Sequence, residues 1–590
     1  MLRATRAAFQ SLVLTAALAA GDTLATTPAD SSATGAQPMT HAPASLEEWA
    51  QGARLFEGLG KFHRPVTTRS AVSQQYFDQG MRLLWAFNHD EAARSFAKSA
   101  QLDPDCAACY WGLALTVGPN YNVAEMSGMR ARVAWDALQK AREHVAQASP
   151  VERALIGALA ARYPGPDPIG PANLESVQTA YASAMREVAL RFPDDLDVQT
   201  LCAEAEMNVH AWRLWTADGQ PVAGTRDIET RLEEVMRRDP GHPGANHYYI
   251  HVMEASPHPE QALAAAERLG GMMPAAGHLE HMPAHILQRV GRYEEAAEAN
   301  RRGAAADETY FATTAAPGYY GMYRAHNYAF LAWSAAMEGR KAEALAAVQS
   351  VSQHVPLDMD LSMGDSGWNL SPQYAVLVRF GLWDELLALR APEARAPGLQ
   401  LGWLYGRGVA LAARGQTDAA REALAHIQQL RKEVGDEARA GGNGLRDVLD
   451  VAEPIVAGRI AATEGRSDDA IGQLEKAVAA EDRLAYNEPS DWFFPARHLL
   501  GAELLLAGRA SQAERVYRED LRRNPANGWS LFGLAAALRA EGRSAEAARI
   551  TQQFHTAWQH ADVRLLTSAF WFAGPDTTSC ECQRTASRDR

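Results

Sequence analysis

The sequence predicts an all-α fold, a solenoid of stacked helical hairpins, and two observations lead to that prediction. Apolar residues recur at helical spacing through almost every segment after residue 45, whereas strand-like alternation is scarce. A glycine, followed five residues later by Ala or Leu, also returns again and again at the expected turn between two helices. Glycine lets the chain turn, and a small residue lets two helices approach closely.

The turn motif also gives the length of the repeating unit. The interval between small residues is 34 residues in three places: from Ala262 to Ala296, from Leu386 to Ala420 and from Ala513 to Ala547. A two-helix unit of this length resembles the tetratricopeptide repeat (TPR), whose hairpins stack into a superhelix. Longer intervals, such as 48 residues from Ala296 to Ala344, indicate inserted loops. The region from about 120 to 240 is helical but fits the repeat poorly.

Length and charge restrict the class of protein and of partner. The chain has 590 residues, 47% of them hydrophobic, and a net charge of −14. A solenoid can reach this length because each repeat contacts only its neighbours. The sequence has no basic stripe, so we expect no nucleic-acid partner. No segment beyond the N-terminus is apolar enough for a transmembrane helix, so we expect no membrane span.

The N-terminus has the pattern of a secretory signal peptide. Arg3 and Arg6 precede the short apolar run Ser11 to Ala20, and Ala17-Leu18-Ala19 fits the small-x-small cleavage rule. This predicts a periplasmic or secreted protein. The predicted divisions are a signal peptide (1–25), a disordered linker (26–45), an N-terminal TPR-like helical region with a His-rich groove (46–310), a C-terminal TPR solenoid (311–572) and a disordered tail (573–590).

The five cysteines are too few for a disulfide framework in so long a chain. The spacing Cys106-x-x-Cys109 leaves two alternatives open: a disulfide in an oxidising compartment, or two buried small hydrophobic residues at a helix junction. Cys580 and Cys582 fall in the predicted tail.

Histidines cluster in the middle of the chain. Eight of the eighteen lie between residues 242 and 326. Two runs, NHYYIHVME and HLEHMPAH, each place three imidazole or carboxylate groups within about 60° of arc on one helix face. Such groups suit transition metals, here Cu, Zn or Fe. The candidate metal ligands are His247, His251, Glu254, His278, His281, His285 and His326.

These seven residues occupy the first helices of three consecutive repeats, which in TPR proteins face the concave groove. Pro283 either kinks the helix that carries the second run or starts a helix at its first turn. Seven donors exceed the four of a structural zinc site, so a dinuclear centre, or one metal with an acid–base pair, is open. Glu254 or Glu280 is then a candidate general base.

The leading hypothesis is therefore a metal-binding TPR protein, with a hydrolase, an oxidase and a metal store all open. The main alternative is a scaffold that binds a peptide or protein in the groove without metal, because partner recognition is the usual role of repeat folds. A hydrogen-bonding groove for a small organic ligand, or plain core packing, would also explain the histidines. Further residues predicted to line a ligand groove are Gln288, Arg289, Tyr486, Glu488, Trp492, Trp529 and Phe532, although large aromatics are more often core.

Residues 46 to 570 are similar to a family of exported bacterial TPR proteins. The motifs that carry the resemblance are FDQGMRLLWAFNHDEA (77–92), YWGLAL (110–115), HPGANHYYIHVMEAS (242–256), AGHLEHMPAHILQRVGRYEEA (276–296), NEPSDWFFPAR (487–497) and NPANGWSLFGL (524–534). The resemblance implies the fold and an exported location, and implies no particular reaction. The chain departs from the family pattern at residues 209–212.

Overall fold

The computed structural model describes residues 43–314 and 320–570, which belong to one compact unit. The predicted signal peptide, the tail with Cys580 and Cys582, and most of the linker lie outside these residues. The described chain is helical almost throughout, which confirms the all-α, TPR-type prediction. None of its helices combines the length and apolarity that a bilayer span requires.

The helices follow one another along the chain, separated by short turns. The first fourteen are α1 (Leu46–Ala50), α2 (Ala71–Trp85), α3 (His89–Leu102), α4 (Ala107–Thr116), α5 (Gly128–Glu143), α6 (Pro150–Arg162), α7 (Leu174–Arg191), α8 (Leu196–Met207), α9 (Thr225–Arg238), α10 (Pro243–Met253), α11 (Leu263–Leu269), α12 (Gly277–His281), α13 (Pro283–Arg289) and α14 (Tyr293–Thr313). The predicted boundary at residues 310 and 311 falls within α14 and stays a prediction.

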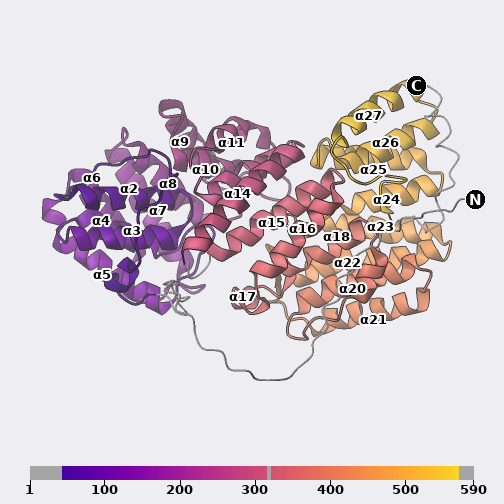
Figure 1. Cartoon of the computed structure of the whole chain (residues 1–590), viewed down its shortest axis with the longest axis horizontal. Helices are drawn as coiled ribbons and strands as arrows, with labels where there is room; N and C mark the ends of the chain where they lie inside the picture. The colour runs from indigo at the N-terminus through magenta and orange to yellow at the C-terminus, as the bar shows by residue number, and fades with distance from the viewer. Residues whose placement is uncertain (1–42, 315–319, 571–590) are drawn as a thin grey trace, which may run out of the picture. The chain divides into compact units, whose positions relative to one another are not determined.

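The second half continues in the same way. Its helices are α15 (Tyr320–Met337), α16 (Lys341–His354), α17 (Leu357–Ser362), α18 (Pro372–Arg379), α19 (Trp383–Ala388), α20 (Pro397–Ala413), α21 (Thr417–Glu433), α22 (Leu445–Thr463), α23 (Ser467–Glu481), α24 (Ala496–Leu506), α25 (Ala510–Arg523), α26 (Gly528–Ala540) and α27 (Ser544–Ala557). Short 3-10 turns are η1 (Val145–Gln147), η2 (Asn208–His210), η3 (Pro259–Ala262) and η4 (Trp368–Leu370). Consecutive helices pack on one another, as α20, α21 and α22 show in Figure 1.

An aromatic side chain between two glycines recurs near both ends of the repeat array. Phe96 of α3 lies against Gly80 of α2 and Gly112 of α4, where an added Cβ would come within 2.6 Å and 2.4 Å of the ring. Tyr517 of α25 lies in the same way between glycines of α24 and α26. Because a glycine leaves no side chain in the way, the ring of one hairpin fills the junction with the next.

Cys106 and Cys109 form a disulfide at the start of α4, which decides between the two alternatives that their spacing left open. Cys202 is a buried free thiol. The disulfide spans only one turn and is enclosed by the first hairpins, because Cys109 lies beside the hydroxyls of Ser73 and Ser99.

A two-stranded hairpin interrupts the helices and holds the segment that precedes α24. Strands β1 (Arg439–Ala440) and β2 (Asn443–Gly444) pair antiparallel. The Asn443 side chain donates to the carbonyl of Ala485 (3.1 Å) and to the carboxylate of Asp491 (2.7 Å). Trp368 donates its indole N–H to the carbonyl of Asp491 (2.9 Å). These bonds fix the position of residues 485–491, which carry Glu488.

The last hairpins contact the middle of the chain as well as their sequence neighbours. The indole of Trp529 in α26 donates to the carbonyl of Ala336 in α15 (2.9 Å), and the Tyr293 hydroxyl donates to the carbonyl of Pro525 (2.9 Å). Asp562 accepts the backbone N–H groups of Lys341 (2.6 Å) and its neighbour at the start of α16. These contacts hold the C-terminal hairpins against α14, α15 and α16.

The glycine at position 112 gives a test of this packing. We expect Gly112→Ala to lower the free energy of unfolding by about 1–3 kcal/mol, because its Cβ would press into the Phe96 ring. Gly157→Ala is the control: this exposed glycine of α6 has nothing within reach of a Cβ, so alanine should stabilise by about 0.5–1 kcal/mol. Thermal unfolding followed by circular dichroism compares the two; equal midpoints would refute the close packing.

Candidate metal centre

Helix α10 positions the first candidate ligands, and its sequence explains how it begins. His242 caps the helix by accepting the N–H of Ala245 (3.1 Å), and Pro243 occupies the first turn, where its missing N–H costs nothing. At Gly244 an added Cβ would come within 2.5 Å of the Trp85 indole. The glycine therefore lets α10 pack directly on the end of α2, and it points His247 and His251 inward.

Pro283 separates the second run of histidines into two short helices. Helix α12 carries His278 and His281, and Pro283 is the first residue of α13, which carries His285. Pro283 thus starts a helix, as one alternative predicted. His278 and His281 are nevertheless helical, so the proline interrupts a helical segment, as the other alternative predicted. His326 comes from the middle of α15.

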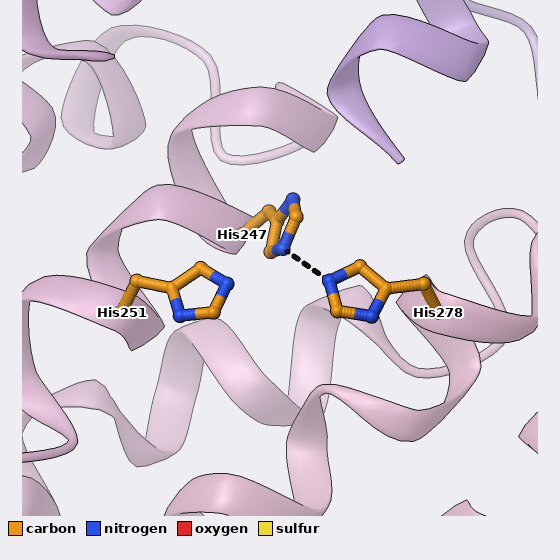
Figure 2. Close-up of side chains that lie close together, drawn as sticks. All are labelled: His247, His251 and His278. Atoms are coloured by element: carbon orange, nitrogen blue, oxygen red, sulfur yellow. Dashed lines mark hydrogen bonds between the residues drawn. The ribbon is translucent and has the colours of Figure 1, made fainter. Parts of the chain in front are cut away.

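Three imidazoles converge on one space to form what we call the first triad: His247, His251 and His278. All three are buried, with ligand atoms within 4.8 Å of one another. The Nε2 atoms of His247 and His278 are 3.2 Å apart, and Figure 2 shows His251 turning a ring nitrogen toward the same space. The Nε2 atom of His251 has no hydrogen-bond partner among the described residues.

Hydrogen bonds fix the tautomer of three of the imidazoles. Because a carbonyl or carboxylate oxygen only accepts, His247 donates Nδ1–H to the carbonyl of Trp85 (2.6 Å) and His251 donates to Glu254 (3.1 Å). His281 donates Nδ1–H to the side-chain oxygen of Asn300 (2.6 Å), whose amide donates to Ala296. Each Nε2 therefore keeps its lone pair, the arrangement that metal-binding histidines adopt.

Two aromatic residues with a left-handed backbone enclose the first triad. Phe87 has φ of 54°, and its ring stacks on His251 and His278 at centroid distances of 5.6 Å. Trp212 has φ of 61° and meets His251 edge-on at 5.8 Å. Such a backbone is costly for a bulky residue and is concentrated at functional sites.

A second group of donors lies beside the first, and His285 is at its centre. Its Nε2 is 2.8 Å from Nε2 of His281, and its Nδ1 is 2.8 Å from Glu254 and 2.5 Å from Glu488. The donors of His281, His285 and His326, and those of Glu254, His285 and Glu488, each lie within 4.8 Å of one another. Apart from His326, which is partly exposed, all of these side chains are buried.

Burial and charge act in opposite directions on these groups. Burial lowers the pKa of His247, His278 and His281 well below the usual value, and that of His326 to about 3, so these rings are neutral at pH 7. Burial also disfavours charged His285, but Glu488 and Glu254 outweigh it and raise the pKa of this imidazole to about 10. Burial raises the pKa of Glu488 to about 7 against the effect of His285.

A cavity of about 470 Å³ opens onto both groups of donors. His251, His278, His285, His326 and Glu488 line one part of it. The volume is that of a small-molecule site. The cavity also has an apolar part and a part with carboxylates, to which Asp365 and Asp491 contribute. A ligand in this cavity would touch the donor atoms directly.

The remaining predicted residues lie at different distances from the cavity. Arg289 stacks on the ring of Tyr486 (5.2 Å) and donates to the carbonyl of Glu254 (2.6 Å), so both adjoin the donors, as does buried Gln288. Trp492 packs on Tyr405. Three others face away from the donors, namely Glu280, which binds Arg302 and Gly271, fully buried Trp529, and Phe532, which packs on Phe554.

Several residues of the site had no signal in the sequence. Glu488 was predicted in the groove but not as a metal ligand, because 203 residues separate it from His285. Nothing in the pattern pointed to Phe87, Asp365 or Trp368. The polar loop YNEPSDWFFP, with its carboxylate between aromatic residues, was the signal that placed Glu488 in the groove, but it gave no sign of metal binding.

The similarities of this chain to known proteins are distant. No family model and no curated protein matches the chain. Similar solved structures include an IFIT1 monomeric mutant with Gppp-AAAA (14% identity, 76% of this chain and 90% of that chain, TM-score 0.33) and the human IFIT1 dimer with m7Gppp-AAAA (11%, 87% and 97%, 0.30). The Cut9–Hcn1 hetero-tetramer of the APC/C is another (11%, 84% and 78%, 0.31). These are TPR-like helical-repeat proteins, and at such identities and TM-scores the likeness carries no argument.

Proposed function

We propose that this chain is a TPR-type metalloprotein that holds transition-metal ions at the end of its cavity. The observation that carries the proposal is the convergence of six buried or partly buried imidazoles and two buried carboxylates around two neighbouring positions. Burying so many polar groups costs free energy unless each is paired or bound. A metal ion at each position would satisfy lone pairs that now face one another or lack a partner.

The donor chemistry narrows the metals. The first triad offers three imidazole nitrogens, and the second group offers imidazoles with Glu254 and Glu488. Nitrogen and oxygen donors without thiolate suit Zn, Cu or Fe. His285 lies close both to the other two histidines of the second group and to its two carboxylates. One ion there would therefore be held by imidazole nitrogens and carboxylate oxygens together.

The position of the donors favours a reactive site over a purely structural one. A structural zinc is closed by four protein ligands, whereas here the donors border a cavity that admits a small molecule. When bound, a metal ion would supply Lewis acidity or an activated water. The chain itself would orient the imidazoles through the carbonyl of Trp85 and through Asn300, and exclude bulk water with Phe87 and Trp212. Burial raises the pKa of Glu488 to about 7, so Glu488 is placed to hold a proton. Burial acts the same way on Glu254, but His251 and His285 outweigh it and lower the pKa of Glu254 to about 2.

An exported location is part of the same proposal. It rests on the signal-peptide pattern at residues 1–25 and is supported by the Cys106–Cys109 disulfide, since disulfides persist in oxidising compartments. Fractionation of cells that produce the full chain, with blotting of periplasm and cytoplasm, would test it. Accumulation of uncleaved protein in the cytoplasm would contradict export.

Removing one donor from each of the three sets of donors tests metal binding. The sets are the first triad, His281 with His285 and His326, and Glu254 with His285 and Glu488. The double variant His247→Ala/His285→Ala takes a ligand from each of the three groups, so we expect it to lose tight Zn binding. Untagged protein would be loaded with Zn, Cu or Fe, dialysed, and measured by mass spectrometry of the metals. Wild type should retain one or two equivalents.

The control for that experiment is His426→Ala/His555→Ala, which removes two exposed histidines far from the cavity and should leave the metal content unchanged. Circular dichroism would check that both variants fold. Metal content equal to wild type in the His247→Ala/His285→Ala protein would refute the site.

Glu488 tests whether the second position needs the C-terminal half of the chain. We expect Glu488→Gln to weaken the second Zn equivalent by about tenfold or more, because a neutral amide replaces a buried carboxylate ligand. The first equivalent, bound by the first triad, should be unaffected. Competition with a chromophoric chelator measures both constants; Glu475→Gln, an exposed substitution on α23, is the control. Unchanged constants would assign Glu488 to packing.

A metal-free scaffold is the alternative outcome of these tests. The apolar part of the cavity, with Met322, Ala325 and Val351, could receive an apolar side chain of a peptide partner. If no metal is retained after loading, and a partner is recovered from extracts in excess chelator, the scaffold replaces the metalloprotein.

A further inference from the structure

The part of the cavity that does not belong to the metal donors carries uncompensated negative charge. Asp365 accepts the backbone N–H groups of Trp368 (2.6 Å) and Gly441 (2.7 Å). Asp491 accepts the side-chain amides of Asn487 and Asn443, each at 2.7 Å. All four donors are neutral, and Asp360, a further buried acid, adjoins Asp365. Within residues 43–314 and 320–570, no Arg, Lys or His forms an ion pair with Asp365 or Asp491.

The carboxylates of Asp365 and Asp491 both contact the turn between β1 and β2, at Gly441. The N–H of Gly441, which has φ of 60°, donates to Asp365, and a Cβ at Gly441 would come within 2.0 Å of the Asp491 carboxylate. Only glycine therefore permits this approach. Burial, with added repulsion from Asp365, raises the pKa of Asp491 to about 6. A cation beside the pair would offset both costs.

An aromatic ring stands beside the carboxylates. Trp368 donates its backbone N–H to the carboxylate of Asp365 and its indole N–H to the backbone carbonyl of Asp491, so its ring is anchored beside both residues. Trp368 lines the cavity together with Tyr323 and Phe493. Aromatic rings and carboxylates together bind ammonium groups through cation–π attraction and charge.

Two buried polar atoms of the same cavity also lack a partner. Oε1 of Glu488 and Nδ1 of His278 have no hydrogen-bond partner among the described residues, although both side chains are at most 4% exposed. Both residues line the cavity. A metal ion or a polar end group of a bound molecule would satisfy them, so this end of the cavity is built for a ligand.

We propose that the cavity binds a small organic amine, with its ammonium group between Asp365, Asp491 and Trp368 and its apolar body against α15 and α16. Met322, Ala325 and Ala329 of α15 and Val351 of α16 supply the apolar contacts. Arg439 also lines the cavity, but its guanidinium bonds to the carbonyl of Gly442 and pairs with neither carboxylate. The inference rests on the proposed function in one respect: the far end of the amine would face the metal donors.

Matched probes on the unaltered protein test the charge preference. Isothermal titration calorimetry at pH 7 would compare 2-phenylethylamine, 2-phenylethanol and 3-phenylpropionate, which share a phenyl body and differ in charge. We expect the amine to bind about tenfold more tightly than the alcohol, and the carboxylate to bind most weakly. Equal binding of amine and alcohol, or tightest binding of the carboxylate, would overturn the proposal.

Substitutions of the two carboxylates test whether they are the source of the preference for the amine. Asp365→Asn and Asp491→Asn should each weaken the amine by about tenfold and change the binding of the alcohol far less, because the negative charge that attracts the ammonium group is removed. Asp358→Asn, on the exposed side of α17, is the matched control and should change neither. If neither cavity variant affects the amine, the ammonium site is wrong.

Repeating the titrations in chelator and after Zn loading separates the two proposals. Retained amine preference in protein that binds no metal would leave the amine site standing and remove the metal function. Metal binding without a preference for the amine would support the metal function and overturn the amine site. Both results come from the full chain, so neither depends on isolated fragments.

Discussion

The approach of Glu488 to His285 is the contact on which the rest of the site depends. Nδ1 of His285 lies 2.8 Å from Glu254 and 2.5 Å from Glu488, so two buried carboxylates face one imidazole. Carboxylates this close repel one another in a low-dielectric interior. The repulsion is relieved by a proton on the imidazole, by a proton on Glu488, or by a metal ion between the carboxylates. The attraction between Glu488 and His285 also holds residues 485–491 against the helices that carry the histidines.

Repeat stacking supplies the surroundings for that contact. Each hairpin packs on the next through small residues and an enclosed ring, as Phe96 does between Gly80 and Gly112, so the helices are held rigidly. The last hairpins then bind α14, α15 and α16 through Trp529, Tyr293 and Asp562. Residues 485–491 are thereby carried to the cavity, where Asn443 and Trp368 hold them.

The strained backbones and buried polar groups around the cavity indicate a binding site. Phe87 and Trp212 adopt left-handed backbones beside His251, and the buried imidazoles are oriented by bonds from Nδ1 to backbone or amide oxygens. Neither feature improves packing, since apolar residues with ordinary backbones would fill the same space at less cost. Polar donors that line a cavity are typical of a binding site, and they are consistent with the proposed metal at one end and the proposed ammonium group at the other.

The sequence by itself determined the helical-hairpin fold, because glycine and alanine recur at turn positions and apolar residues recur at helical spacing. It also determined which histidines share a face, because 3.6 residues per turn place His247 and His251 together whatever the fold around them. Only the tertiary structure decided that the clusters on α10, α12, α13 and α15 meet, and that Glu488 joins them. Helical periodicity fixes directions within one helix, whereas contacts between helices depend on how hairpins stack and where the chain returns. Local spacing carries no record of that return, so only packing brings Asp365, Asp491 and Glu488 into one cavity.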